Sequence, residues 1–435
     1  MLPSSDVTIY VPTYNRPEFL SRTLRFLQQG PVRLPIIVGD GSDASAAAKN
    51  ETLCRSLGAN IEYFHLPSVS GFAGATRSYL QRYLAALQRV KTPFVASCAD
   101  DDLLLPETVV KCAAFLAENP DYVGCQGTYL FFRYLENVHL KIEGVCYDTP
   151  SVDGNEIGSR LMQFYWRYEA PFYAVYRTSV QRSIFERAQS ISINILVETF
   201  HSAAVILEGK LKRLDDIYCL RNIGIPTHPI PIEGWYQWMI KDFDGFVDNY
   251  REHRATIIEM AASRSDLRID LHSLRRAIDM AFMIYVGGHG FPMYKLIEEY
   301  LPIAVADRQE RDRLQRGFAT KFAMSFADQQ EQGRLATEAA HEPIASQATS
   351  STLQIRIAIK RLLRALIEAA FGESGLKLTR QLRSSMRPEQ KQINGPAVTP
   401  PTSEPADLSM QIPTTLVNRF TAAQWDLVRR RIPKD

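Results

Sequence analysis

Residues 94–106, FVASCADDDLLLP, are the stretch that decides the fold. The apolar run at 94–98 is typical of a buried strand, and Pro106 stands where a following helix can begin. Three adjacent acids, at 100–102, lie between the two. In open α/β sheets, ligands bind beyond the carboxyl ends of the strands. The stretch therefore predicts a strand, an acidic loop that faces a ligand, and a helix.

The rest of the N-terminal half alternates short apolar runs with helical patterns, which favours a Rossmann-like α/β domain with a mostly parallel mixed sheet. Strands are predicted at 7–11, 36–38, 61–64 and 94–98, and helices from Pro17, over about 75–90 and after Pro106. Pro12 is expected to end the first strand. Residues 122–148 are strand-like, and residues 157–221 mix helices with short strands.

Four segments are predicted along the chain. The α/β domain covers residues 1–232, and an α-helical appendage covers 233–340. A basic amphipathic helical segment covers 341–385. The remaining segment, 386–435, is rich in Pro and Ser, so we expect a largely disordered tail that can end in a helix.

The composition is that of a soluble globular protein, with 46% hydrophobic and 23% charged residues. A net charge of +2 gives no reason to expect a nucleic-acid partner. The six cysteines are scattered, which favours free thiols in a reducing compartment. No run reaches the roughly 18 apolar residues of a membrane span. We therefore expect a cytoplasmic protein.

The three acids at 100–102 predict a divalent-metal site. Adjacent carboxylates repel one another, and Mg²⁺ or Mn²⁺ would offset that repulsion by binding carboxylate, water and phosphate oxygens. A diphosphate leaving group would complete the coordination, and the metal would stabilise the charge that develops on it. An acidic turn that caps the following helix is the alternative explanation of the same residues.

Four motifs, in this order, resemble those of the inverting family 2 glycosyltransferases, which have the GT-A fold. They are VTIYVPTYNR at 7–16, IIVGDGSD at 36–43, GFAGATR at 71–77 and ADDDLLLP at 99–106. The resemblance implies that a sugar moves, with inversion, from a nucleotide diphosphate donor to an acceptor hydroxyl, with a UDP-sugar favoured. It also implies a glycan or glycolipid acceptor in the synthesis of a bacterial surface polysaccharide or glycolipid.

The resemblance assigns roles to residues of these motifs. Pro12 and Thr13 would pack around the nucleotide base, and Asp40 would accept a hydrogen bond from a uracil-like imide. Arg77 would lie near the diphosphate, and Asp100 on the ribose side. The expected nucleotide-binding residues are Pro12, Thr13, Tyr14, Arg16, Asp40, Arg77 and Asp100, and the expected metal ligands are Asp101 and Asp102. Purely structural roles in strand ends, turns and exposed helix positions remain the alternative for Pro12, Asp40 and Arg77.

The sequence departs from the family pattern at residues 39–42, which read Gly-Asp-Gly-Ser where the family usually has Asp-Asp-Gly-Ser. The acid expected to read the base, Asp40, is kept. A neighbouring carboxylate is lost, and this loss bears on the preference for uridine.

A second departure concerns the general base that takes the acceptor's proton. The family supplies this base from a Glu-Asp pair at the start of a helix, and here the pair reads Glu198-Thr199. Glu198 is therefore the predicted catalytic residue, with Asp215 and Asp216 as alternatives. A helix-start carboxylate favoured by the helix dipole is the structural explanation of Glu198.

Three further features leave alternatives open. His201, one turn after Glu198, could touch the acceptor or lie in the core, and His228 could reach the diphosphate or the metal. The predicted helix at 353–371 has an apolar and a basic side, so it can pack on the protein's own helices or lie on the inner face of the cytoplasmic membrane. Donor binding is expected to survive loss of residues 353–435, because the nucleotide motifs lie before residue 110.

Two other functions compete with this interpretation. A catalytically silent, nucleotide-binding scaffold protein is kept open by Thr199. A sugar-phosphate nucleotidyltransferase would carry a Gly-rich, Arg-containing loop after the first strand, and residues 11–15 read Val-Pro-Thr-Tyr-Asn instead.

Overall fold

The computed structural model of the chain describes residues 6–69, 72–134, 140–166, 168–191, 194–223, 243–264, 270–288 and 410–432. The chain falls into two compact units, one of Met1–Leu271 with Ala406–Asp435 and the other of His272–Pro405. Helix α10 (Leu271–Gly288) holds the described part of the second unit. The first unit contains every residue that the sequence assigned to the donor, the metal or the base.

The first unit is built on a sheet that has ten strands within the described ranges. They are β1 (Val7–Thr13), β2 (Ile36–Asp40), β3 (Ile61–His65), β4 (Phe94–Ser97), β5 (Leu103–Leu104), β6 (Tyr122–Tyr134), β7 (Leu140–Tyr147), β8 (Val175–Arg177), β9 (Lys210–Asn222) and β10 (Met410–Gln411). The order along the sheet is β10-β7-β6-β8-β4-β1-β2-β3, and β9 pairs with β5 and β6. Strands β1 to β4 are parallel to their neighbours within that group. The mixed, mostly parallel α/β fold expected from the sequence is confirmed.

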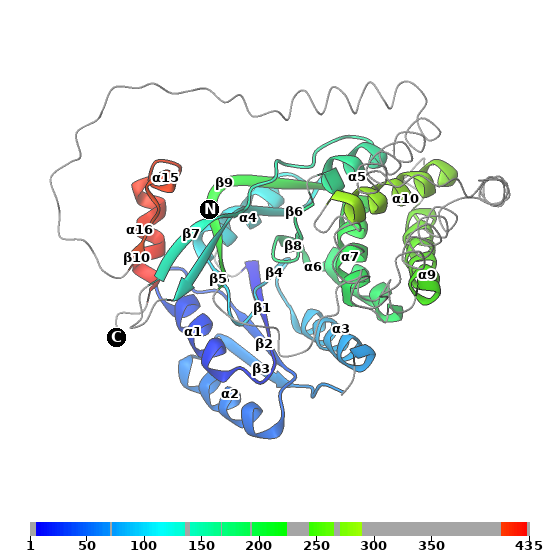
Figure 1. The fold of residues 1–435 in the computed structure, drawn as a ribbon. Helices are drawn as coiled ribbons and strands as arrows, with labels where there is room; N and C mark the ends of the chain where they lie inside the picture. Colours follow the sequence, from blue (N-terminus) through cyan, green and yellow to red (C-terminus); the bar gives the residue numbers. More distant parts are fainter. Residues whose placement is uncertain are drawn as a thin grey trace, which may run out of the picture. The chain divides into compact units, whose positions relative to one another are not determined.

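Helices cover both faces of this sheet (Figure 1). The described helices of the first unit are α1 (Pro17–Gln28), α2 (Ala44–Leu57), α3 (Phe72–Arg89), α4 (Pro106–Glu118), α5 (Ile157–Trp166), α6 (Thr178–Arg187), α7 (Asn194–Glu208), α9 (Phe243–Ala262), α15 (Thr414–Val417) and α16 (Ala422–Arg431), with a 3₁₀ turn at Ala188–Ser190. Helix α9, which lies in the segment expected to form a separate appendage, belongs to the first unit and packs on α7. The predicted helix at 353–371 lies outside the described residues.

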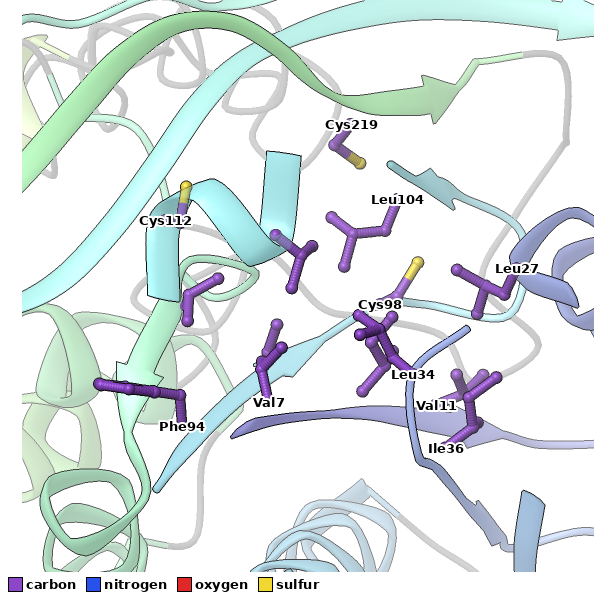
Figure 2. Packing of buried hydrophobic residues seen from close by; sticks show 14 of the residues in the cluster. Val7, Val11, Leu27, Leu34, Ile36, Phe94, Cys98, Leu104, Cys112 and Cys219 are labelled. Atoms are coloured by element: carbon purple, nitrogen blue, oxygen red, sulfur yellow. The ribbon is translucent and has the colours of Figure 1, made fainter. Parts of the chain in front are cut away.

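The two faces of β1 contact different helices because successive side chains of a strand point in opposite directions. Val7, Ile9 and Val11 share one apolar cluster with residues of α1 and α4. Tyr10 points the other way and meets Tyr83 of α3 edge-on, with 4.8 Å between ring centres. Figure 2 shows the first cluster, in which side chains from β1, α1 and α4 and from the residue after β4 pack together. Burial on both faces explains the nearly continuous apolar run of β1.

The carboxyl ends of β1, β2 and β4 lie at one edge of the sheet. Thr13 is in register with Asp40, and Tyr10 is in register with Ser97. The loops that follow these strands therefore leave the sheet side by side. Pro12 does not end β1 as expected, because β4 has already ended opposite Tyr10 and no strand needs an amide from Pro12 on that side.

The last described residues, 410–432, return to the sheet of the first unit. β10 pairs in parallel with β7, with Met410 opposite Leu140. A reciprocal capping box of Thr421 and Gln424 begins α16. In Figure 1 these elements lie beside β7 and α1. The sequence predicted a largely disordered tail that can end in a helix; residues 410–432 contain such a helix and, in addition, form part of the core.

Among the described helices, none combines the length and the apolarity needed to cross a bilayer.

Candidate active site

The acidic loop, residues 99–102 between β4 and β5, is held from two sides. On β1, the Thr13 hydroxyl donates to Oδ2 of Asp100 at 2.7 Å. On α1, the Thr23 hydroxyl donates to the backbone carbonyls of Asp100 and Asp102, at 2.7 and 3.1 Å. Both threonines are buried, so these bonds replace the water that the loop has lost. The conformation of the acidic loop is therefore set by β1 and α1.

Arg16 places a positive charge against the acidic loop. Its guanidinium pairs with Asp101 and lies 3.5 Å from Oδ1 of Asp100. Asp100 and Asp102 are each 4% exposed, whereas the Asp101 side chain is 20% exposed. Asp101 is therefore the acid of the loop that a ligand reaches most directly.

Burial disfavours the ionised form of both buried acids, and the neighbouring cations offset this only in part. Burial raises the pKa of Asp100 to about 7, although Arg16 and Thr13 oppose the rise. Burial also raises the pKa of Asp102 to about 7, where Asp101 adds to the rise and Arg221 opposes it. Raised carboxyl pKa values mean that a further positive charge at this position would be favourable.

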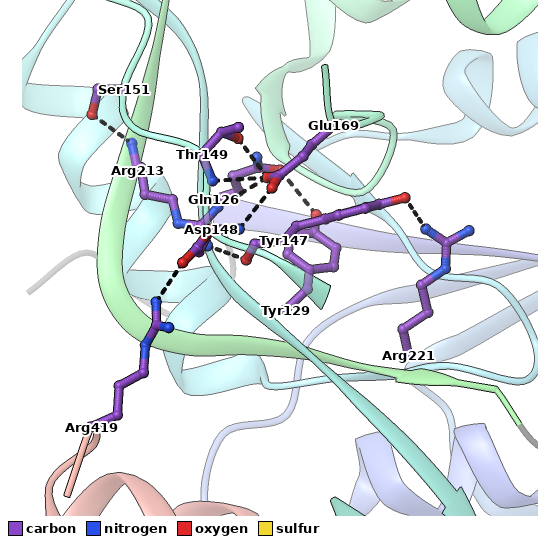
Figure 3. A network of polar contacts seen from close by, with 10 residues as sticks. All are labelled: Gln126, Tyr129, Tyr147, Asp148, Thr149, Ser151, Glu169, Arg213, Arg221 and Arg419. Carbon is purple, nitrogen blue, oxygen red and sulfur yellow. Dashed lines mark hydrogen bonds and ion pairs between the residues drawn. The ribbon is translucent and has the colours of Figure 1, made fainter. Parts of the chain in front are cut away.

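Arg221, near the end of β9, extends the site beyond the residues that the sequence singled out. The Asn222 amide donates to Oδ1 of Asp102 at 2.8 Å, which fixes the end of β9 against the acidic loop. Arg221 donates to the Tyr147 hydroxyl of β7, and its guanidinium carbon lies 5.3 Å from the centre of that ring (Figure 3). The only signal in the sequence was an arginine directly after the apolar run 217–220.

Glu198 is partly buried in the second turn of α7. The Tyr168 hydroxyl donates to its Oε1 atom at 2.7 Å. Burial raises the pKa of Glu198, while Tyr168 and Arg221 lower it. Because Arg221 also acts on the pKa of Asp102, its guanidinium lies within electrostatic range of both carboxylates. The helix dipole acts mainly within the first turn of a helix. Because α7 begins at Asn194, Glu198 lies beyond that turn.

Residues 8–188 match the family described as glycosyl transferase family 2. These residues form a family 2 glycosyltransferase domain. The match begins in β1, includes the acidic loop and ends before α7. The family and the enzyme class expected from the sequence are confirmed.

Several solved structures resemble the chain, at low identity. S. aureus TarS 1–349 is 14% identical, with 74% of this chain and 80% of that one covered and a TM-score of 0.45. The same fragment in complex with UDP-GlcNAc is 14% identical, with 74% of this chain and 82% of that one covered and a TM-score of 0.45. The mannosyltransferase PcManGT from Pyrobaculum calidifontis, in complex with GDP-Man and Mn²⁺, is 13% identical, with 72% of this chain and 84% of that one covered and a TM-score of 0.34. We infer no function from likenesses at these TM-scores. No curated protein matches the chain in sequence.

Asp40 lies inside the glycosyltransferase domain and has no exposed surface. Its Oδ1 atom accepts the Ser42 amide at 2.7 Å, and its Oδ2 atom accepts Asn50 at 2.8 Å and the Tyr63 hydroxyl at 2.9 Å. These three bonds shape the loop that follows β2. Both oxygens of the Asp40 carboxylate thus already accept hydrogen bonds within the protein. Recognition of the nucleotide base by Asp40 stays a prediction.

Gly39 occupies the position where the family usually has a second acid, and neighbouring side chains explain the glycine. A Cβ atom on Gly39 would lie 2.9 Å from the Tyr10 hydroxyl and 2.9 Å from Cζ of Phe64. Tyr10 and Phe64 therefore fill the space that an aspartate would need. The packing between β1, β2 and β3 therefore explains why a glycine stands here in place of an acid.

Helix α3 presents two arginines in opposite ways. Arg77, predicted to lie near the diphosphate, is exposed. Arg82 is 3% exposed and donates to the Leu66 carbonyl at 3.2 Å and to Oγ of Ser68 at 2.8 Å. A Cβ atom on Gly41 would lie only 2.4 Å from the Arg82 guanidinium carbon. Arg82 thus supports the loops after β2 and β3, and motif matching missed it because it lies beyond GFAGATR.

The other predicted residues are spread over different parts of the domain. Pro12 and Tyr14 are half-buried at the end of β1. Asp216 pairs with Lys111 of α4 at 2.5 Å, and Asp215 is exposed, so their contacts are with α4 and α16 rather than with the acidic loop. His201 hydrogen bonds the Gln181 side chain at 2.9 Å, and burial lowers its pKa to about 3, which keeps it neutral in the core. His228 lies outside the described residues.

The acidic loop fits a divalent cation that shares its ligands with a substrate. Within the described ranges, no three His, Cys, Asp or Glu side chains converge on a preformed metal cage. Mg²⁺ and related hard ions are commonly held by one or two carboxylates together with water and substrate phosphates. Asp101 and Asp102 supply two such carboxylates, of which Asp101 is partly exposed and Asp102 is oriented by the Asn222 amide.

A hollow of about 740 Å³ lies away from this site, beside Thr92, Pro93 and Arg177. These residues lie at the amino end of β4, whereas the acidic loop follows its carboxyl end. The hollow therefore has no part in the site described above.

Proposed function

We propose that the chain is a metal-dependent inverting glycosyltransferase that moves a sugar from a nucleotide diphosphate donor, with a UDP-sugar favoured, to an acceptor hydroxyl. The observation that carries this proposal is the acidic loop of the family 2 domain, where Thr13, Thr23 and Arg16 hold three adjacent acids at the carboxyl end of β4. Carboxylates fixed at a strand end can hold a donor's diphosphate through a divalent metal, which a transfer from a nucleotide diphosphate donor requires.

On the donor side, Asp101 and Asp102 would hold Mn²⁺ or Mg²⁺, which when bound would stabilise charge on the departing diphosphate. Asp101 is the more exposed of the two, and the Asn222 amide orients Asp102. Arg16 lies against the same acids and can donate to a diphosphate oxygen. Asp100, fixed by Thr13, would face the ribose. Pro12, Tyr14, Asp40 and Arg77 complete the proposed nucleotide contacts.

On the acceptor side, Glu198 would be the general base. As the acceptor oxygen bonds to the anomeric carbon, the bond from that carbon to the diphosphate oxygen breaks. The acceptor's proton passes to Glu198, and the electron pair of the broken bond leaves on the diphosphate. Burial supports this role because it raises the pKa of Glu198 above the usual carboxyl range, which makes the carboxylate a stronger base near neutral pH.

We take the acceptor to be a glycan or glycolipid hydroxyl in bacterial surface polysaccharide or glycolipid synthesis. The setting would be the cytoplasm or the inner face of the cytoplasmic membrane, with residues 353–371 as the peripheral contact. The family resemblance supports these assignments.

The experiment that tests the donor side measures UDP binding by calorimetry in Mn²⁺ and in EDTA. We expect much tighter binding with Mn²⁺, because such ions are held jointly by one or two carboxylates and substrate phosphates. Asp101→Asn should remove most of the difference, because it removes the more exposed of the two predicted metal ligands. Asp153→Asn, an exposed acid elsewhere in the domain, is the matched control and should keep it.

Equal affinity in Mn²⁺ and EDTA would exclude the metal role. Metal-dependent binding of UDP without hydrolysis or transfer of any UDP-sugar would instead favour the silent scaffold protein.

A further inference from the structure

Arg431, the last residue of α16, is buried against the N-terminal part of the first unit, with 1% of its side chain exposed. Its Nε and Nη2 atoms donate to the two carboxylate oxygens of Glu107, at 2.9 and 2.7 Å. Nη1 donates to the carbonyls of Phe26, at 3.2 Å, and Gln29, and Nη2 also donates to the carbonyl of Val32 at 3.2 Å. One carboxylate and a group of backbone carbonyls thus surround the whole guanidinium fork.

The two helices that Arg431 joins both adjoin the acidic loop. Glu107 lies in the first turn of α4, which begins at Pro106, shortly after the loop. The bonded carbonyls belong to the last turn of α1 and the residues that follow it. Helix α1 begins directly after Arg16 and carries Thr23, whose hydroxyl donates to two carbonyls of the loop. A bond between the far end of α1 and the start of α4 can therefore set the spacing of the two helices at the loop.

Apolar residues of the same C-terminal segment pack against the residues that follow the loop. Leu103 and Leu105, which come directly after Asp102, belong to a buried cluster shared with that segment. Its members from the segment are Met410, Leu416, Phe420, Trp425, Val428 and Ile432. Leu103 also pairs with Leu220 of β9, just before Arg221. The segment therefore contacts the same frame that holds the acids and Arg221.

Polar contacts hold the outer side of the segment. Arg419 pairs with Asp148 at 2.9 Å, next to the network of Thr149, Glu169 and Arg213 (Figure 3). The Arg419–Asp148 pair is exposed on both sides, so it adds little energy compared with the buried Arg431 contacts. The contacts of Arg431 are the ones that reach α1 and α4 directly.

We propose that Arg431 is a positioning residue of the transferase site. By joining the end of α1 to the start of α4, it holds Arg16 and Thr23 at the correct distance from Asp101 and Asp102. The inference rests on the proposed function and adds a residue, far along the chain, on which the donor and metal contacts depend.

The position requires arginine rather than any cation. Gly30, with a φ of 83°, turns the chain after α1, and a Cβ atom there would lie 3.1 Å from Nη2 of Arg431. The backbone is thus shaped around a planar fork. Lysine carries the same charge, but it cannot bind a carboxylate through two parallel bonds and reach the carbonyls as well.

The test uses full-length variants and measures UDP affinity with Mn²⁺ together with kcat and KM for the donor. Arg431→Lys removes the planar guanidinium group. Glu107→Gln weakens the same contact from the other side, so the proposal can still be tested if Arg431→Lys fails to fold. Arg430→Ala changes the exposed neighbour. Ile184→Ala, fully buried in α6 away from the acidic loop, controls for a general loss of stability. All are assayed at a temperature where circular dichroism shows each variant folded.

We expect Arg431→Lys and Glu107→Gln to weaken Mn²⁺-dependent UDP binding and to lower kcat/KM by up to about a hundredfold, since misplacing site groups by about 1 Å can cost that much in rate. Arg430→Ala and Ile184→Ala should bind as the wild type does, although Ile184→Ala melts at a lower temperature.

Wild-type affinity and turnover in folded Arg431→Lys would overturn the positioning role, and so would an equal loss of affinity in Ile184→Ala. A wild-type protein that fails to bind UDP with Mn²⁺ would overturn the proposed function and this inference together, and that outcome is distinct from either of the first two.

Discussion

At the scale of single residues, the proposed base is the most direct point to test. Glu198→Gln keeps the shape of the side chain and its bond with Tyr168, but it cannot take a proton. We expect turnover to fall by about 10²-fold or more, the usual worth of general-base catalysis, while UDP affinity stays unchanged. Steady-state transfer assays and calorimetry on the same preparation separate the two quantities.

Asp215→Asn is the matched variant for that experiment, because Asp215 is exposed and contacts α16 rather than the acidic loop. It should retain wild-type turnover. If Asp215→Asn lost activity and Glu198→Gln kept it, the base would lie on β9 and the assignment of Glu198 would be wrong.

The hydrogen bond from Tyr168 to Glu198 predicts a change in pH dependence. Burial raises the pKa of Glu198, and the Tyr168 hydroxyl lowers it. A base must be ionised, so activity should be lost as pH falls through this pKa. Tyr168→Phe removes a contact that stabilises the ionised form, so the pKa rises further and the acid limb of the kcat/KM profile should move to higher pH.

The control for the pH experiment is Tyr165→Phe, because the Tyr165 hydroxyl donates to the Thr199 carbonyl instead of Glu198. In the described part of the chain, Tyr79, Tyr147, Tyr165 and Arg221 also lie within electrostatic range of Glu198. An acid limb that stays in place in Tyr168→Phe, or one that moves equally in Tyr165→Phe, would assign the limb to another group.

At the scale of elements, the strands and helices of the N-terminal half could be predicted because their signals are local. An apolar run, a polar loop and a Pro at a first helical turn are enough to give β4, the acidic loop and α4. The same local signals gave β1 to β3 and α1 to within a few residues. Pro12 was misjudged because its effect depends on where the neighbouring strand β4 ends, which is a property of the sheet.

The supporting residues of the site could not be predicted because their roles depend on long-range contacts. Thr23 bonds a loop that lies far along the chain, and Arg221 approaches Glu198 and Asp102 only once β9 has joined the sheet. Arg82 is buried under the loop after β2, four residues after Ser78 on the same face of α3. A motif names residues at strand ends, but it does not name the side chains that hold those ends in place.

The C-terminal elements show the same limit more strongly. The Pro- and Ser-rich composition before residue 410 indicates disorder, and it left a terminal helix possible but gave no sign of the short strand β10 or of packing into the core. Trp425, Val428 and Ile432 follow helical spacing, but so short a helix gains its stability from packing rather than from propensity. Its place on α1 and β7 could be found only from the folded structure.

At the scale of the whole molecule, the first unit is made from two distant parts of the sequence, Met1–Leu271 and Ala406–Asp435. The motifs that recognise the nucleotide all lie in the first part, which is why sequence reasoning treated the C-terminal region as separable. The buried cluster around Leu103 and Leu105 contradicts that separation for residues 410–432. Donor binding and the C-terminal segment are therefore expected to depend on one another.

Deletion of residues 406–435 should unfold or strongly destabilise the glycosyltransferase domain, opposite to the outcome that the sequence alone predicted. Burial of one large apolar side chain contributes about 1.5–3 kcal/mol, so loss of Phe420, Trp425 and their neighbours removes on the order of 10 kcal/mol. The free energy of unfolding of a typical domain is about 5–15 kcal/mol. The deletion also leaves Glu107 and the end of α1 without Arg431.

Thermal melting and UDP binding with Mn²⁺ measure the effect of the deletion. A peptide of residues 406–435 added in trans should raise the melting temperature as its concentration increases, because it binds only the folded form. A truncated chain that melts like the full-length protein and binds UDP equally well would show that the segment is dispensable, and would return the C-terminal residues to the role of a tail.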